Sequence, residues 1–280
     1  MPGRPYGGPV PAIRLNHTDL YYEDMGDGSP LVMLSGLGVH LGVWAGVAPT
    51  LARTHRVVLP DHRGSGRSAP VNDPLTISHL ADDVHALTST LRLPRVNLLG
   101  HSMGGFIAME IAARYPELVE RVILYSTSME TISPALRFLE SIEQVWKECP
   151  DISNATLSRI FLPWNWSPAL LDDAATVEGI VEMAGHNPYP MSYASYRAQL
   201  AACRAFDGRA LATRIVSPTL VIAGRNDLIS PLRCSEELAQ TIPGARLRIS
   251  PCGHMTHMEK PGWFCEAVLD FTASENSPSC

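Results

Sequence analysis

Gly100-His101-Ser102-Met103-Gly104-Gly105 decides the fold class of this chain, because a buried strand precedes it and an amphipathic helix follows it. The strand is predicted over 95–99, which is short and mostly apolar, as buried parallel strands are. The helix is predicted over 103–114, where apolar side chains recur at helical spacing as far as Tyr115-Pro116. Ser102 therefore lies on a predicted strand-to-helix turn, the setting in which G-x-S-x-G indicates a nucleophilic serine.

The glycines of this stretch have a physical reason to be there. A sharp turn that lifts a serine hydroxyl clear of a sheet forces that residue into strained backbone geometry. Positions two before and two after it then approach closely, and Gly100 and Gly104 carry no side chains. The helix that follows points its N-terminal amides at the serine, where negative charge develops during acyl transfer. A glycine-bearing turn with an incidental serine is the alternative, so the rest of the chain decides.

Composition limits the function classes. The chain has 280 residues, 45% of them hydrophobic, which fits one large domain with an insertion. Its net charge is −6 and its basic residues are scattered, so we expect a small-molecule substrate as partner, with neither nucleic acid nor a membrane surface. Residues 1–11 are rich in Pro and Gly and are predicted to be a flexible tail, not a signal peptide. The six cysteines form no C-x-x-C motif, which favours reduced thiols and a cytoplasmic location.

Strand and helix patterns alternate along most of the chain. Strands are predicted at 13–15, 20–22, 31–34, 56–60, 95–99, 121–125, 218–223 and 246–249, and helices at 44–51, 77–91, 103–114 and around 263–271. This alternation predicts a doubly wound, mostly parallel α/β sheet. Residues 129–210 show only helical patterns and many aromatics, so we expect a helical lid, here called the cap, inserted into a core of 12–128 and 211–275.

Partners for the serine follow two late strands. A serine hydroxyl is a weak nucleophile at neutral pH and needs a base that is oriented by an acid. Asp227 comes just after the predicted strand 218–223, and His254 just after the predicted strand 246–249. The carboxyl ends of parallel strands meet at one edge, so Ser102, Asp227 and His254 can converge there. His257 is the rival base and Glu130 the rival acid.

Four ordered blocks resemble the α/β-hydrolase superfamily over nearly the whole chain: Ser35-Gly36-Leu37-Gly38 with Trp44, Asp61 to Ser68, Gly100 to Gly105, and Gly253-His254 through Glu259-Lys260-Pro261. Within it the chain looks most like the 3-oxoadipate enol-lactone hydrolase and aminoacrylate hydrolase-like group. The resemblance implies the α/β-hydrolase fold. It also implies Ser102 as nucleophile, His254 as base and Asp227 as acid, with an oxyanion hole formed by the backbone amides of Leu37 and Met103.

One departure from the superfamily pattern concerns the oxyanion loop. Many members have His-Gly where this chain has Ser35-Gly36. Because the donor is a backbone amide, the exchange is expected to change the support of the loop and spare its chemistry.

Four further polar residues are expected to have structural roles and to take no part in the chemistry. These residues are His101, Asp61, Arg63 and Ser68.

The chemistry predicted from these residues is hydrolysis of a carboxylic ester or lactone of a small, largely apolar substrate, through an acyl-enzyme on Ser102. Candidate substrate-binding residues are His40, Trp146, Trp164 and Tyr193. The sequence has no metal-ligand spacing and no dinucleotide fingerprint, so no cofactor is expected. We expect the protein to be a monomer or a homodimer. The alternatives are a C–C bond hydrolase, a cofactor-free perhydrolase, a natural-product cyclase or synthase, and a ligand receptor.

Overall fold

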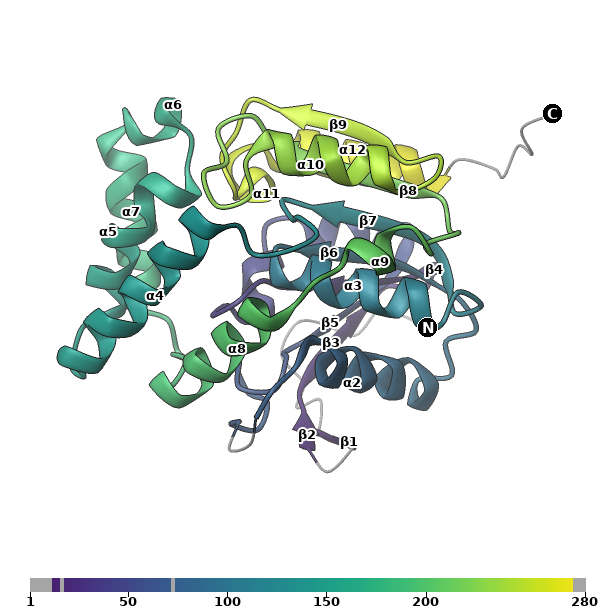
Figure 1. Cartoon of the computed structure of the whole chain (residues 1–280), viewed down its shortest axis with the longest axis horizontal. Helices are drawn as coiled ribbons and strands as arrows, with labels where there is room; N and C mark the ends of the chain where they lie inside the picture. Colours follow the sequence, from purple (N-terminus) through teal and green to yellow (C-terminus); the bar gives the residue numbers. More distant parts are fainter. Residues whose placement is uncertain (1–11, 16–17, 72–73, 274–280) are drawn as a thin grey trace.

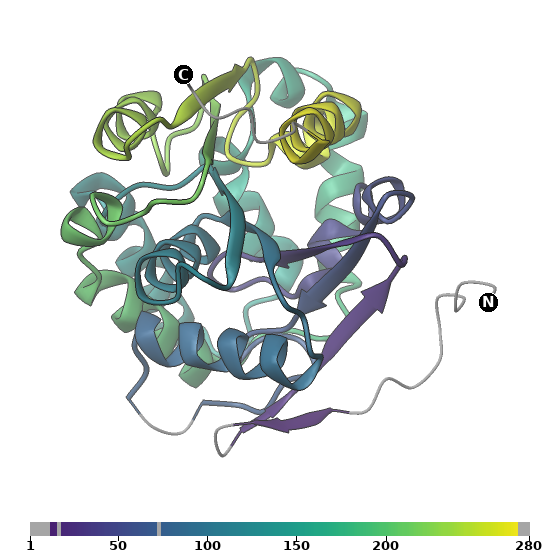
Figure 2. The same ribbon diagram turned by 90° about the vertical axis from the view of Figure 1, so that its right-hand side faces the viewer.

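The computed structural model describes residues 12–15, 18–71 and 74–273, and its centre is a seven-stranded sheet with helices on both faces (Figures 1 and 2). The strand order is β3-β5-β4-β6-β7-β8-β9, and β3 alone among these strands runs antiparallel to its neighbour. The strands are β3 (Tyr22–Met25), β4 (Ser29–Leu34), β5 (His55–Pro60), β6 (Val96–His101), β7 (Val119–Tyr125), β8 (Thr219–Gly224) and β9 (Arg246–Ser250). The predicted mostly parallel α/β sheet is confirmed. The predicted tail 1–11 lies outside the described residues.

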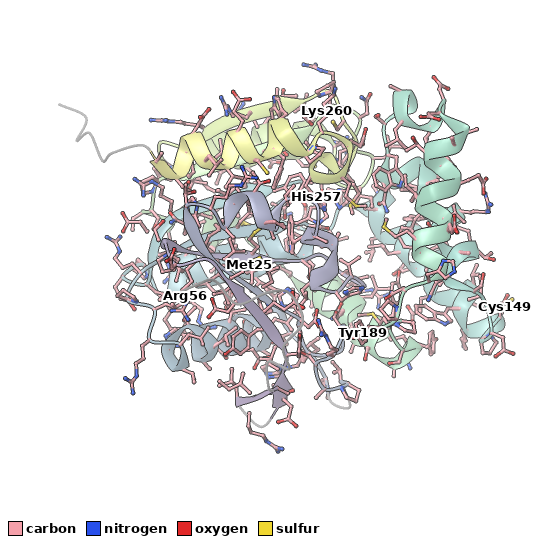
Figure 3. All side chains as sticks on the ribbon, turned by 180° about the vertical axis from the view of Figure 1, so that it is seen from behind. Met25, Arg56, Cys149, Tyr189, His257 and Lys260 are labelled. Carbon is pink, nitrogen blue, oxygen red and sulfur yellow. The ribbon has the colours of Figure 1, made fainter. Side chains whose placement is uncertain are left out.

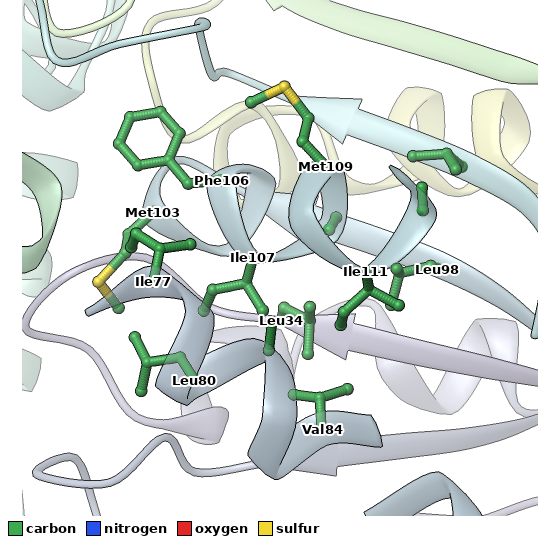
Figure 4. Close-up of a cluster of buried hydrophobic side chains, with 14 of the residues drawn as sticks. Leu34, Ile77, Leu80, Val84, Leu98, Met103, Phe106, Ile107, Met109 and Ile111 are labelled. Atoms are coloured by element: carbon green, nitrogen blue, oxygen red, sulfur yellow. The ribbon is translucent and has the colours of Figure 1, made fainter. Parts of the chain in front are cut away.

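Successive residues of each central strand enter opposite hydrophobic layers, as the two-residue period of a strand requires. In β6, Leu98 packs into one layer and Leu99 into the other. The first layer is covered by α2 (Ile77–Thr90), α3 (Met103–Arg114), α9 (Arg209–Ala212) and α10 (Leu232–Thr241). The second is covered by the 3₁₀-helix η1 (Leu41–Trp44), α1 (Ala48–Leu51) and α12 (Pro261–Ala273). Figure 4 shows Leu34 and Leu98 beneath α2 and α3, so the segment carrying Ser102 rests on a packed core.

Two local predictions were wrong in detail. The strand predicted over 20–22 is divided at Tyr21, whose amide donates to Ser68 Oγ at 2.9 Å instead of continuing a ladder. Hence β2 (Thr18–Leu20) pairs with β1 (Ile13–Leu15), while β3 joins the main sheet. The helix predicted over 44–51 is instead η1 and α1, separated by a turn; Pro49 lies in the first turn of α1, where its missing amide costs nothing.

Five helices lie wholly within residues 129–210: α4 (Ser133–Glu148), α5 (Asn154–Asn165), α6 (Pro168–Leu171), α7 (Ala174–Gly185) and α8 (Tyr193–Ala205). Figure 1 shows α4–α7 beyond the end of the sheet where the short helix α11 (Thr256–Glu259) lies. An isolated antiparallel β-bridge between Glu130 and Asp207 joins the segment that precedes α4 to the segment that follows α8. Phe138, Leu157 and Tyr196 belong to a hydrophobic cluster of this segment. Among the described residues, no helix is long and apolar enough to cross a membrane.

Candidate active site

Ser102 occupies a strained turn between β6 and α3. Its φ of 54° and ψ of −118° are far from helical or extended values, which costs about 1–3 kcal/mol in a residue with a side chain. The Ser102 amide donates to the Tyr125 carbonyl at 3.0 Å, and the Thr127 hydroxyl donates to the Ser102 carbonyl at 2.9 Å. These bonds to β7 and to the segment that follows it hold the turn in place.

Two glycines allow this turn to close. A Cβ built on Gly100 would lie 2.2 Å from the Gly104 carbonyl oxygen, and one on Gly104 would lie 2.3 Å from the Leu34 carbonyl oxygen. Real Cβ atoms do not approach backbone oxygens so closely, so any side chain at either position would push the turn apart. The steric reason expected for both glycines from the sequence is therefore confirmed.

Asp227 and His254 form a buried pair at the ends of β8 and β9. His254 Nδ1 lies 2.8 Å from Asp227 Oδ2, and the two side chains are 5% and 0% exposed. The other carboxylate oxygen, Oδ1, accepts the amides of Ile229 at 2.9 Å and Ser230 at 2.8 Å. These donors fix the carboxylate, which in turn fixes the imidazole with Nδ1 facing the acid and leaves Nε2 for other partners.

Two side chains contact the backbone carbonyl of His254. His101 Nε2 lies 3.1 Å from the His254 carbonyl oxygen, and the Tyr125 hydroxyl donates to the same oxygen at 3.0 Å. His101 immediately precedes Ser102, so the segment carrying the serine directly supports the segment carrying the histidine. This contact gives His101 the scaffold role that was expected for it.

No hydrogen bond among the described residues joins Ser102 Oγ to His254. The contact between the two segments is made by His101, whose ring centre is 4.6 Å from that of His254. Catalytic hydrogen bonds are often long before substrate binds and tighten in the Michaelis complex. The approach of Ser102 to His254 therefore stays a prediction.

The rival base and the rival acid are both engaged elsewhere. His257 is 1% exposed, packs 4.8 Å from the Trp44 ring and lies with Nδ1 3.0 Å from the Tyr125 hydroxyl. Figure 3 shows His257 beside α12. Burial lowers the pKa of His257 to about 3, so this imidazole stays neutral near pH 7. Glu130 is half-exposed and pairs with Arg209. Asp227 is thus the carboxylate that meets His254.

The loop from Ser35 to Gly38 passes directly against the serine. A Cβ built on Gly36 would lie 3.2 Å from Ser102 Cβ. Neither the Leu37 amide nor the Met103 amide donates a hydrogen bond to another described residue. At Met103 this follows from its place as the first residue of α3, since the first amides of a helix have no partner within it. Both amides are thus available as donors beside Ser102.

Support for this loop comes from His62. His62 Nε2 lies 3.2 Å from the Ser35 carbonyl oxygen, and burial lowers the pKa of His62 to about 4. The imidazole is therefore a neutral partner for the loop backbone at the place where the sequence departs from the superfamily pattern. Nothing in the local sequence pattern singled out His62 for this role, because Ser35 lies 27 residues away.

The predicted scaffold of the 61–68 loop is present. Asp61 accepts the amides of Leu41 at 2.7 Å and Arg67 at 2.9 Å. The Ser68 hydroxyl donates to the Asp61 carbonyl at 2.7 Å, and Arg63 forms a two-pronged ion pair with Asp83. These side chains are used internally, as expected.

The four candidate substrate contacts differ in their neighbours, although Trp146 and Trp164 pack against the same cap cluster. Trp146 and Tyr193 line a hollow of about 620 Å³ formed by α4, α5 and the segment before α8. Trp164 stacks on Phe138 with ring centres 4.2 Å apart. His40 caps η1, accepting the Gly42 amide, and meets the Tyr189 ring edge-on at 5.8 Å. Their contact with substrate stays a prediction.

Sequence reasoning assigned no role to Glu259, yet it joins the cap to the His254 loop. Its carboxylate accepts the Gly253 amide at 2.7 Å, the Ser167 hydroxyl at 2.5 Å and the Ser167 amide at 3.1 Å. A Cβ built on Gly253 would lie 2.6 Å from the Asn165 carbonyl oxygen, so the cap backbone rests directly on this loop. Glu259 is predicted from the sequence only as part of a motif.

Within the described residues, no group of three or more His, Cys, Asp or Glu side chains is arranged to hold a metal ion.

Comparison with known proteins gives a consistent result. A family model for the alpha/beta hydrolase fold matches residues 29–164 and 182–261. A Rhizobium rhizogenes protein named "Putative carbamate hydrolase RutD" is 31% identical over 260 residues, 91% of this chain and 97% of that protein. The 2-hydroxymuconate semialdehyde hydrolase of a Pseudomonas species is 30% identical over 267 residues, 91% of this chain and 90% of that protein. Among solved structures, the enol-lactonase from Burkholderia xenovorans LB400 has a TM-score of 0.84 at 29% identity, covering 94% of this chain and 100% of that one. The predicted resemblance is confirmed: the chain belongs to the alpha/beta hydrolase fold family.

Proposed function

We propose that this protein is a serine hydrolase that cleaves a carboxylic ester or lactone of a small, largely apolar substrate through an acyl-enzyme on Ser102. The observation that carries the proposal is the strained backbone of Ser102 at the start of α3, on a sheet edge that also holds the buried Asp227–His254 pair. Strain of this kind persists where the surrounding structure enforces it, and it gathers at reactive residues.

In the first half-reaction, His254 Nε2 takes the proton of Ser102 Oγ as that oxygen attacks the substrate carbonyl. The negative charge that develops on the carbonyl oxygen is met by the amides of Leu37 and Met103. Asp227, held by the amides of Ile229 and Ser230, stabilises the imidazolium that forms. His254 then gives its proton to the departing alkoxide, which leaves an ester of Ser102.

In the second half-reaction, His254 takes a proton from water, and the resulting hydroxide adds to the Ser102 ester. The same two amides meet the second oxyanion. Collapse returns the proton from His254 to Ser102 Oγ and releases a carboxylic acid. A lactone substrate gives one hydroxy acid, because alkoxide and acyl group stay joined.

The relatives support this choice of reaction class. The names of the matched proteins include an enol-lactonase and a carbamate hydrolase, and both a lactone and a carbamate offer a carbonyl carbon to a nucleophile. The aromatic side chains of the cap favour an apolar substrate. The 2-hydroxymuconate semialdehyde hydrolase keeps C–C bond hydrolysis as the second candidate.

The test is labelling with a fluorophosphonate, which reacts with activated serines, combined with turnover of p-nitrophenyl esters, lactones, carbamates and dienones. We expect the wild-type chain to be labelled at Ser102 and to hydrolyse an ester or lactone. Ser102→Ala is expected to lose both properties and to keep the thermal unfolding curve of the wild type. Ser89→Ala, at an exposed serine of α2, is the matched control and should behave as wild type. Hydrolysis by Ser102→Ala at the wild-type rate would refute the proposal, and turnover of dienones alone would replace it with C–C hydrolysis.

A further inference from the structure

Gln199, in the cap helix α8, is completely buried although it carries a polar amide. Its Oε1 accepts the Gly38 amide at 3.1 Å. Its Nε2 donates to the Arg63 carbonyl at 3.1 Å and to Ser65 Oγ at 3.0 Å. One side chain of the cap thus joins two core loops, which lie 161 and about 135 residues away in the sequence.

The three partners require an amide at this position. The Gly38 amide needs an acceptor, while the Arg63 carbonyl needs a donor, so the orientation of the Gln199 amide is fixed by its surroundings. A carboxylate of the same length would supply only acceptors, and an apolar side chain would leave all three groups without their partner. Buried polar groups that lose their hydrogen-bond partners cost folding free energy. Among side chains of this length, glutamine therefore suits this position, because it supplies both the acceptor and the donor.

The acceptor end of Gln199 holds the residue that follows the proposed oxyanion donor. Gly38 has a φ of 80°, a left-handed conformation that suits glycine, and its Cβ position lies 4.0 Å from the Tyr196 ring of the same helix α8. Leu37 itself packs against both the core and the hydrophobic cluster of the cap. The direction of the Leu37 amide therefore depends on where Gly38 is held.

We propose that Gln199 is a positioning residue: it fixes the loop that carries the Leu37 amide, and so couples the alignment of the oxyanion hole to helix α8. The inference rests on the proposed function, since it concerns how that hole is aligned. The second end of Gln199, on Arg63 and Ser65, anchors it to the scaffold loop beside the site, which prevents α8 from moving independently of Gly38.

A misaligned oxyanion donor weakens binding of the transition state more than binding of the substrate. Removing one such donor typically lowers kcat by about 10²–10³-fold, and displacing it without removing it is expected to cost about tenfold to a hundredfold. KM should stay within about threefold, because the ground-state carbonyl gains little from the same amide. A purely structural role would instead lower the unfolding temperature and leave kcat of the folded fraction unchanged.

The experiment compares Gln199→Met with two controls on the full chain. Methionine keeps the length and volume of the side chain and removes its hydrogen bonds. Gln144→Met makes the same exchange at an exposed position of α4, and Val181→Ala weakens the packing of a buried side chain of α7 outside the cluster that Leu37 contacts. The readouts are kcat and KM on the best ester or lactone, the rate of fluorophosphonate labelling at Ser102, and thermal unfolding.

We expect Gln199→Met to lose about tenfold to a hundredfold in kcat and in labelling rate at nearly constant KM, with Gln144→Met unchanged. Wild-type kcat in folded Gln199→Met, or an equal loss in Val181→Ala at equal destabilisation, would overturn the inference. If Gln199→Met does not fold, Gln199→Asn takes its place, because it keeps the amide but shortens the side chain by one methylene and so withdraws the acceptor from the Gly38 amide; an unchanged kcat there also overturns the role. A different pair of results would refute the proposed function itself: no labelling of the wild-type protein at Ser102, and wild-type turnover in Ser102→Ala.

Discussion

His62 and His257 are expected to make this protein sensitive to mild acid. They are 2% and 1% exposed, and burial lowers their pKa values to about 4 and about 3, against 6.5 for a solvated imidazole. For His62 the hydrogen bond to the Ser35 carbonyl opposes the shift without reversing it. In the folded state both imidazoles are therefore neutral at pH 5, where unfolded chains carry them protonated.

The sign and size of the effect follow from linkage. Between the folded and unfolded pKa values the unfolded chain binds more protons, so stability falls as the pH drops from about 6.5 toward about 4. At pH 5 each imidazole lies about 1.5 units below its unfolded pKa, which corresponds to about 2 kcal/mol each and about 4 kcal/mol together. A typical domain is stable by about 5–15 kcal/mol, so the loss would be a large part of the total.

The assay is urea unfolding at pH 7.5 and pH 5.0, with His257→Asn compared with wild type. Asparagine keeps a polar atom for the Tyr125 hydroxyl and cannot take up a proton, so the loss between the two pH values should shrink by about 2 kcal/mol. His79→Asn, at an exposed position of α2, is the matched control and should retain the full wild-type loss. A wild-type loss under about 1 kcal/mol, or an identical loss in His257→Asn, would refute the reasoning.

Three further outcomes follow from the site. Asp227→Asn is expected to lower kcat by about 10³–10⁴-fold with KM nearly kept, since the imidazole loses the anion that sets its tautomer; steady-state kinetics measures this. Glu259→Ala should destabilise the fold by about 2–3 kcal/mol in urea, because it leaves the Gly253 amide and Ser167 without their acceptor; an unchanged midpoint would contradict the role of this carboxylate. Gly104→Ala should cost about 3 kcal/mol or more, seen as a lower unfolding temperature, because its Cβ would meet the Leu34 carbonyl oxygen.

Local patterns predicted the elements well wherever a single periodicity decides the conformation. The helix over 103–114 has the bounds expected from its apolar spacing, and α2 begins at Ile77 as predicted. The strand over 20–22 failed because a distant group, Ser68, takes the Tyr21 amide out of the ladder. A partner 47 residues away leaves no trace in a window of a few residues.

The same distinction applies to the site. Asp227 and His254 could be predicted because each directly follows a recognisable strand, and parallel strands bring their ends together. His62, Gln199 and Glu259 could not, because their roles depend on which carbonyl or amide the fold places opposite them. A buried glutamine in a helical segment has no periodicity that separates it from an exposed one.

The cap contacts bear on how the substrate range of this fold can change. Gln199 of the cap accepts the Gly38 amide beside Leu37, and Ser167 of the cap donates to Glu259, whose carboxylate also accepts the Gly253 amide beside His254. Trp146 and Tyr193 line a hollow and contact neither loop through a hydrogen bond among the described residues. Substitutions at Trp146 or Tyr193 would reshape the hollow without removing a hydrogen bond to a core loop, whereas replacement of residues 129–210 as a whole would remove the partners of both loops. The cap therefore contains two kinds of position: those that hold the core loops through polar atoms, and those, such as Trp146 and Tyr193, that make no hydrogen bond to these loops among the described residues.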